Sequence, residues 1–295
     1  MRETPAKERS AIILVTGANG TTGSEVVRQL VGEGRPVRAM VRKPENAVSL
    51  PKEHVEVVVG SFSDIESLDS AMAGVDAVFM ISFEYPDQLA LQANVIEAAK
   101  RAGVRMMARL SVVRANAKAE NLLFSNHGKG DRQLAQSGLG YVLIRPQWFN
   151  QNFLSYCPGG VISLPAGDAP LSFVDVRDIA AVTIKALTEP GHGGRAYDLT
   201  GPEALNHTEV AAILSETTGK CFVYENVSSE SYCERLLDGG ASEHYADLLI
   251  KLYASLRGRS VSEVHDDIEH VLSRPATNFR QFAHDYADEL AKQVV

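Results

Sequence analysis

Three glycines spaced three residues apart constrain the fold of this chain more than any other feature of its sequence. They are Gly17, Gly20 and Gly23, within the stretch LVTGANGTTGSEVVRQL. An apolar run at 11–15 precedes them, and an amphipathic helical pattern follows them. A turn without Cβ atoms lets backbone N–H groups approach a phosphate, and the start of a helix adds a favourable dipole. The pattern predicts a strand, a turn and a helix that bind a dinucleotide; the alternative is a turn that binds nothing.

The first half of the chain alternates short apolar runs with helical patterns. We expect strands at 11–16, 36–42, 54–59, 75–81, 105–112 and 140–145. Helices are predicted between them at about 21–34, 64–72, 87–102 and 119–137. Strands that are apolar on both faces and separated by helices form a parallel sheet covered on both sides. This order predicts an α/β protein with a doubly wound parallel sheet, the Rossmann fold.

The alternation breaks after Pro146. The later patterns predict strands near 161–164, 171–174, 195–199 and 221–225, and helices at about 176–188, 207–218, 229–238, 242–257, 261–272 and 278–292. The predicted organisation is a flexible tail at 1–10, a dinucleotide-binding domain at 11–156 with 171–200 returning to it, and a smaller, mainly helical substrate lobe at 201–295 with 157–170. We expect this lobe to close over the carboxyl edge of the sheet.

Composition argues against several classes of protein. Among the 295 residues, 45% are hydrophobic and the net charge is −8, which indicates a packed core and disfavours nucleic acid as a partner. No window approaches the roughly 18 apolar residues of a membrane helix, so we expect no membrane association. Three scattered cysteines fit neither a disulfide framework nor a zinc site, and we expect no metal. A cytoplasmic monomer or homodimer that binds a small molecule is predicted.

Two basic residues after the second predicted strand indicate which dinucleotide is bound. Sites for NAD place an Asp or Glu about 20 residues beyond the glycine turn, but Arg42 and Lys43 stand here. A guanidinium meets a 2′-phosphate with paired hydrogen bonds, whereas a carboxylate repels it. We therefore expect NADP(H), with a solvated basic loop as the alternative.

The predicted cofactor site extends along the ends of the strands. It comprises the glycine turn, the two basic residues and three residues that follow later strands: Gly17, Asn19, Gly20, Thr21, Thr22, Gly23, Arg42, Lys43, Phe62, Ser82 and Ser111. The ring of Phe62 either packs on the adenine or belongs to the core. Phe83 is expected beside the ribose and the substrate.

The proton donor typical of short-chain reductases is absent from the sequence. Those enzymes use Tyr-x-x-x-Lys, in which the tyrosine passes a proton to the carbonyl. No tyrosine here has a lysine four residues later, and Tyr141, which has Arg145 there, lies in a predicted strand. Either another group supplies the proton, or none is needed.

The stretch FSNHGKGDRQLAQSGLGYVLIRPQWFNQNF resembles the NmrA-like family of atypical short-chain dehydrogenases/reductases. The matching positions are His127, Asp131, Ser137–Gly138, Arg145–Pro146, Phe149 and Asn152. LSFVDVRDIAAV and YDLTGPEAL match as well, so the resemblance runs from Ile12 to about Glu289. It is strongest to the bacterial quinone oxidoreductase and azoreductase-like branch, which uses NADPH to reduce quinones or related conjugated acceptors.

The resemblance implies roles for several side chains. It places His127 at the nicotinamide, to donate a proton or orient the substrate, with Lys129 as the second catalytic candidate. The alternative is that both lie in a polar surface loop. Trp148, Phe149 and Asn152 are the implied substrate contacts, although Trp148 can equally belong to the core.

This chain also departs from the family pattern at positions expected to line the substrate pocket. Val112 and Arg114 stand where related proteins tend to carry a small residue and a glycine, and Trp148 replaces a smaller residue.

Two functions remain open from the sequence. The first is an NADPH-dependent oxidoreductase that passes a hydride to a quinone, enone or related aromatic carbonyl acceptor, including a tailoring reductase of secondary metabolism. The second is a non-catalytic NADP(H)-sensing regulator of the NmrA type that acts through protein partners. A sensor can lose catalytic side chains and keep the glycine turn, so the missing tyrosine is compatible with both.

Overall fold

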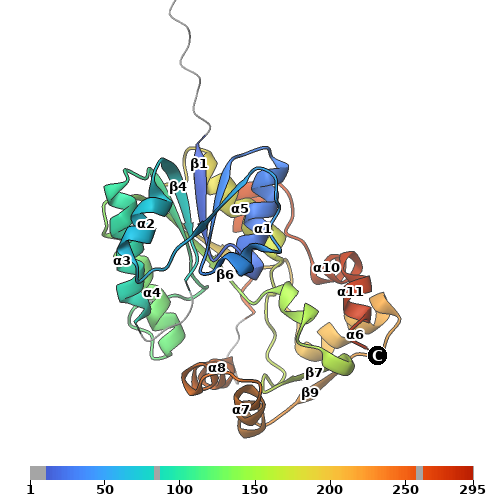
Figure 1. The fold of residues 1–295 in the computed structure, drawn as a ribbon. Coiled ribbons are helices and arrows are strands. Elements are labelled where there is room, and N and C mark those ends of the chain that lie inside the picture. Colours follow the sequence, from blue (N-terminus) through green and yellow to red (C-terminus); the bar gives the residue numbers. More distant parts are fainter. Residues whose placement is uncertain (1–10, 83–86, 257–261, 295) are drawn as a thin grey trace, which may run out of the picture.

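Seven parallel strands form one sheet with helices on both faces (Figure 1). The computed structural model describes residues 11–82, 87–256 and 262–294, so the predicted tail at 1–10 lies outside the described residues. Neighbouring strands pair in parallel in the order β3-β2-β1-β4-β5-β6-β8. Their bounds are Ile12–Thr16 (β1), Val37–Val41 (β2), Val55–Val59 (β3), Val75–Met80 (β4), Met106–Leu110 (β5), Gly140–Pro146 (β6) and Arg195–Leu199 (β8). The predicted Rossmann fold is confirmed.

Alternate residues of the strands supply two separate cores. Ile13 and Val15 face α1 and α5, while Leu14 faces α2, α3 and α4, because successive side chains of a strand point to opposite sides. Figure 1 shows these two helical layers on either side of the sheet. The helix bounds are Thr21–Gly32 (α1), Ile65–Met72 (α2), Gln88–Arg101 (α3), Leu122–Ala135 (α4) and Val176–Thr188 (α5). Burial on both faces explains the continuous apolar runs of the strands.

The second half of the chain builds a smaller lobe beyond the carboxyl ends of the strands (Figure 1). A two-stranded parallel sheet joins β7 and β9. The elements of the lobe are β7 (Val161–Leu164), β9 (Val223–Asn226), α6 (His207–Thr218), α7 (Ser229–Asp238), α8 (Glu243–Leu256), α10 (Phe279–Asp285) and α11 (Ala287–Ala291). The lobe has its own core, in which Phe153, Phe173 and Phe279 contact one another edge-on or tilted and Leu290 is fully buried. None of the described helices is both long and apolar enough to cross a bilayer.

The structure differs from the sequence expectations in this second half. The strand expected at 171–174 does not form; only isolated bridges occur there, from Val174 to Phe149 and from Leu171 to Leu205. The helix expected at 278–292 is interrupted at Tyr286, which separates α10 from α11. Apolar content predicted burial correctly at these positions, but it did not predict the backbone conformation.

One helix of the predicted C-terminal lobe packs against the main sheet instead. The helix expected at 261–272 is shorter, and α9 spans Asp267–Leu272. Ile268 and Val271, three residues apart on one helical face, enter the core between the sheet and α5. The chain therefore returns from the lobe to the core between the sheet and α5.

Two buried carboxylates at the start of α5 connect the lobe to the sheet. Asp175 caps the helix by accepting from the Arg177 backbone N–H at 2.8 Å, and it accepts from the Gln151 amide at 2.8 Å. Asp178 accepts from the Arg274 guanidinium and from the Thr277 backbone N–H, each at 2.7 Å. Both carboxylates are fully buried, so their charge is compensated by these donors and, for Asp175, by the Arg177 guanidinium at 2.7 Å.

A histidine in the lobe core makes stability depend on pH. His207 is 2% exposed, stacks on Tyr224 with ring centroids 5.2 Å apart, and contacts Phe153 and Phe173. Burial lowers its pKa from 6.5 to about 4. Between these values the unfolded chain binds a proton that the folded protein does not, so stability falls as pH falls.

We expect this residue alone to reduce the free energy of unfolding by about 3 kcal/mol as the pH falls from 7 to 4. Urea unfolding of the parent and of His207→Phe at several pH values measures the effect. Phenylalanine keeps the ring and cannot bind the proton, so the variant should lose that share of the pH dependence. Parallel stability curves for the two proteins would contradict the assignment.

Candidate active site

A cavity of about 520 Å³ lies at the carboxyl ends of β1 to β4. The strand order reverses between β1 and β4, which is where ligands bind in open α/β sheets. Its walls are the glycine turn, the end of β2, the turn after β3 and the start of α3. Among the predicted cofactor residues it is lined by Gly17, Asn19, Gly20, Arg42, Phe62 and Ser82.

The glycine turn is shaped by close backbone contacts. Gly17 has a φ of 58°, in the left-handed region, and its carbonyl accepts from the Gly20 N–H at 3.0 Å. A Cβ on Gly23 would overlap that same carbonyl, so only glycine fits at the first turn of α1. Gly20 is the N-cap of α1 and provides no side-chain oxygen to the first-turn amides. Those amides and the helix dipole are thus oriented toward a bound anion.

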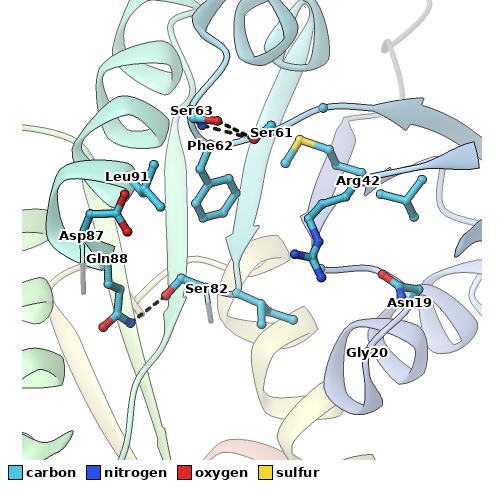
Figure 2. Close-up of a pocket in the computed structure, with 15 residues that line it drawn as sticks. Asn19, Gly20, Arg42, Ser61, Phe62, Ser63, Ser82, Asp87, Gln88 and Leu91 are labelled. Carbon is cyan, nitrogen blue, oxygen red and sulfur yellow. Dashed lines mark hydrogen bonds between the residues drawn. The ribbon is translucent and has the colours of Figure 1, made fainter. Parts of the chain in front are cut away.

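Two side chains extend into this cavity from opposite walls (Figure 2). Arg42, exposed at the end of β2, reaches toward the glycine turn, and Phe62 enters from the turn after β3. The Phe62 carbonyl accepts from the Asn94 side chain at 2.9 Å, which holds the turn in place, and the ring also contacts the core on that face. A cation and an aromatic ring on either side suit an adenosine phosphate.

A second cavity of about 310 Å³ lies at the carboxyl ends of β5 and β6. Both cavities are lined by Ser82. The second is walled by Ser111, His127 and, on α8, by Leu248 and Leu252. Trp148, Phe149 and Asn152, three of the predicted substrate contacts, line it as well, and Trp148 also packs on Tyr253 with ring centroids 5.2 Å apart.

Two serine hydroxyls are available beside the cavities, since Ser82 lines both and Ser111 lines the second. The Ser82 oxygen accepts from the Gln92 amide at 2.7 Å and from the Gln88 amide at 3.1 Å, so its own proton is directed elsewhere. Ser111 is 2% exposed, and its hydroxyl has no hydrogen-bond partner among the described residues. Both hydroxyls can therefore bond to a ligand.

A buried cluster of charged side chains supports this part of the site. Each oxygen of the Asp131 carboxylate accepts hydrogen bonds from a different guanidinium. One accepts from Arg109 at 2.7 Å, and the other accepts from Arg145 at 2.8 and 3.0 Å. Arg109 also donates to Gln92 at 3.1 Å, which joins the cluster to Ser82. The side chains of Arg109 and Asp131 are 1% and 5% exposed, so neither charge is solvated by bulk water.

His127 projects from α4 toward the second cavity and is held by the same cluster. An Arg109 N–H donates to its Nδ1 at 3.5 Å, and because arginine cannot accept, this contact favours the tautomer with the proton on Nε2. His127 is 7% exposed and lies within a helix rather than in the surface loop considered as an alternative.

Two glycines in α4 explain how the cluster fits. A Cβ on Gly130 would overlap the Arg109 guanidinium, and one on Gly128 would overlap the backbone of Asn116 and Ala117. Glycine inside a helix costs about 1 kcal/mol relative to alanine. Here it lets a buried cation and a loop lie directly against the helix.

Several predicted residues line neither cavity. Thr22 and Gly23 are buried beneath the turn, while Thr21 and Lys43 point to solvent. Lys129 is exposed because it lies about 200° around α4 from His127. Phe83 lies outside the described residues. No group of His, Cys, Asp or Glu suited to a metal ion occurs in the described part of the chain.

Sequence reasoning missed the residues that support the site. Arg109 lies in the strand predicted at 105–112, and a charged residue within the apolar stretch RMMARLS is a signal of a buried ion pair. Gln88 and Gln92 gave no signal, because glutamine on a helix is ordinary. The lobe was expected to close over the carboxyl edge of the sheet, and its helix α8 contributes leucines to the second cavity.

Asp131→Asn should lower the free energy of unfolding by about 3 kcal/mol, because it leaves the buried Arg109 without its counter-charge. Urea denaturation measures the loss. The matched control is Asp69→Asn, which breaks an Arg101 pair whose side chains are each 47% exposed and should cost less than about 1 kcal/mol. Equal losses in the two variants would show that the cluster is not a structural requirement.

Comparison with known proteins identifies the family of this chain. The model of the NmrA-like family matches residues 9–284. An NAD(P)H azoreductase of Xenophilus azovorans is 36% identical over 94% of this chain and 98% of the relative. A (4-alkanoyl-5-oxo-2,5-dihydrofuran-3-yl)methyl phosphate reductase of Streptomyces griseus is 34% identical over 96% of this chain and 100% of the relative. The NADPH-dependent quinone oxidoreductase of Escherichia coli, solved with NADPH, superposes with a TM-score of 0.80 at 29% identity, over 92% and 99% of the two chains. This chain belongs to the NmrA-like family.

Proposed function

We propose that this protein is an NADPH-dependent oxidoreductase that transfers a hydride to a quinone or another conjugated carbonyl acceptor. The observation that carries the proposal is that Ser82 lines both cavities. A long cofactor lying in the first cavity would present its reactive ring at the second, against the bound acceptor.

The first cavity fits the adenosine and phosphate end of NADPH. The uncapped first turn of α1 suits the pyrophosphate, and Arg42 suits the 2′-phosphate that distinguishes NADPH from NADH. Ser82 and Ser111 would bond to the nicotinamide end.

The second cavity fits a flat apolar acceptor. Leucines of α8 and the Trp148 ring provide an apolar wall, and His127 presents Nε2–H as a donor for a carbonyl oxygen. Bound NADPH supplies a hydride, which is two electrons and one hydrogen, and a proton from water completes the hydroquinone. The hydroquinone anion that hydride transfer would form is delocalised, so this reaction does not require the missing tyrosine.

The relatives support the same class of reaction. Two are named as NAD(P)H or NADPH-dependent oxidoreductases of azo compounds and quinones, and a third as the reductase of an alkanoyl dihydrofuranone phosphate. We infer a small-molecule acceptor of this conjugated type, as in the tailoring reductases of secondary metabolism. Cys157, Cys221 and Cys233 are all free thiols, in keeping with the cytoplasmic placement that we propose.

NADPH oxidation, followed by absorbance against a panel of quinones, azo compounds and conjugated ketones, tests the proposal. Turnover with NADPH well above that with NADH is the expected result. Tight NADPH binding without turnover on any member of the panel would reject the proposed activity in favour of the alternative, a regulator that senses NADP(H) and acts through a protein partner.

Arg42→Ala should reduce kcat/KM for NADPH by about tenfold or more and leave that for NADH within about twofold, since only NADPH carries the phosphate that the guanidinium meets. Steady-state kinetics with both cofactors at saturating acceptor measure this selectivity. Lys43→Ala, which removes the adjacent charge outside the cavity, should change the selectivity less. An unchanged NADPH/NADH ratio in Arg42→Ala would exclude Arg42 from cofactor recognition.

His127→Gln should lower kcat by at least about tenfold, because the donor to the acceptor carbonyl is displaced. Lys129→Gln, two residues further along α4 on its exposed face, should retain the parent rate. Stopped-flow measurement of hydride transfer separates this effect from product release. Loss of rate in the lysine variant alone would reverse the assignment.

A further inference from the structure

One arginine stands in a backbone conformation that favours glycine, at the edge of the second cavity. Arg114 has a φ of 65° and lines that cavity. It is the third residue of a four-residue turn closed by the Ala115 N–H, which donates to the Val112 carbonyl at 3.2 Å. Turns with a positive φ at this position usually carry glycine there. A long cationic side chain is thus held where the backbone disfavours any side chain.

Among the described residues that line the second cavity, the charges are unbalanced. No described residue that lines it is Asp or Glu, although the whole chain has a net charge of −8. Arg114 pairs with Glu263 at 3.3 Å, and Glu263 is outside the lining. The two side chains are 30% and 58% exposed, so the pair is solvated and weak. A ligand anion in the cavity can compete with that carboxylate for the guanidinium.

We propose that Arg114 is a specificity residue that binds an anionic substituent (a sulfonate, carboxylate or phosphate) on the acceptor. This inference rests on the proposed function and narrows it to acceptors with an apolar body and one acidic group. The guanidinium exchanges the Glu263 carboxylate for the acceptor anion and donates two parallel hydrogen bonds to it.

The rest of the cavity determines how such an acceptor lies. Ser82, Ser111 and His127 line this cavity with polar groups, to which the reducible carbonyl would bond, and α8 with Trp148 provides the apolar wall. Arg114 follows Ser111 by three residues in the same loop, so the acidic group and the carbonyl lie along one side of the acceptor. Neutral acceptors pack against the same apolar wall but form no ion pair with Arg114.

The test compares two acceptors that differ mainly in charge, 1,4-naphthoquinone and 1,4-naphthoquinone-2-sulfonate. The measured quantity is the ratio of kcat/KM for the sulfonate to that for the neutral quinone, after subtraction of the non-enzymatic rate. The two quinones differ in reduction potential, but that difference is the same for every variant. A change in the ratio therefore reports recognition of the anion.

Removal of the guanidinium should lower this ratio by at least about tenfold, in Arg114→Gln and also in Arg114→Gly, which suits the turn. Arg114→Lys should recover part of it. Glu263→Gln, which removes the competing carboxylate, should raise the ratio. Arg101→Gln removes an equal charge from the C-terminal end of α3 and should leave the ratio unchanged.

Binding gives a readout that does not depend on turnover. Trp148 is the single tryptophan of the chain and lines the cavity, so its fluorescence reports occupancy. With NADP⁺ present, the sulfonate should bind Arg114→Gly at least about tenfold more weakly than the parent, and added salt should weaken its binding to the parent more than to the variant.

The two proposals fail in different ways. Absence of reduction of either quinone, with normal sulfonate binding that depends on Arg114, would reject the reductase and retain the anion site. Reduction of both quinones with a ratio and a dissociation constant in Arg114→Gln and Arg114→Gly within twofold of the parent would overturn the anion site alone.

Discussion

The carboxylate of Asp131, shared between two guanidinium groups, fixes the part of the molecule on which the candidate site depends. One guanidinium belongs to β5 and the other to β6, while the carboxylate belongs to α4. The contact therefore sets the position of the helix relative to two strand ends. His127 on that helix and Ser111 after β5 take their places from it, and Arg109 extends the same control through Gln92 to Ser82. Because the charges of Arg109 and Asp131 are buried, bulk water cannot replace either of them when its partner is missing.

The parts of the fold and site that were predictable from sequence are those with a local cause. The strand, turn and helix around Gly17, Gly20 and Gly23 follow from backbone sterics within seven residues, and the Rossmann fold follows from the alternation of apolar runs with helices. Strand ends meet at one edge of a parallel sheet, which is why Arg42, Phe62 and Ser82 were placed together without knowledge of the strand order. The predicted class, an NAD(P)H-dependent oxidoreductase, agrees with the relatives.

The remainder depends on contacts between segments that are distant along the chain. Nothing near Arg109 indicates that an aspartate 22 residues later will neutralise it, and Gly130 looks unfavourable in a helix until that guanidinium is seen against it. Lys129 is exposed because a residue two positions from a buried one is on the other side of a helix. The segment at 171–174 is as apolar as a strand, yet it crosses between two cores and forms only single bridges.

The return of α9 to the sheet and the burial of Leu290 beside Phe153 determine the order in which this protein can be made. When the first half of the chain leaves the ribosome, the core between the sheet and α5 still lacks Ile268 and Val271, and the core of the lobe still lacks α11. The nascent chain must carry a partly exposed sheet until these residues are made, and closure depends on contacts between residues far apart in sequence, which form slowly. Synthesis of this fold therefore gives chaperones a long interval in which to bind it.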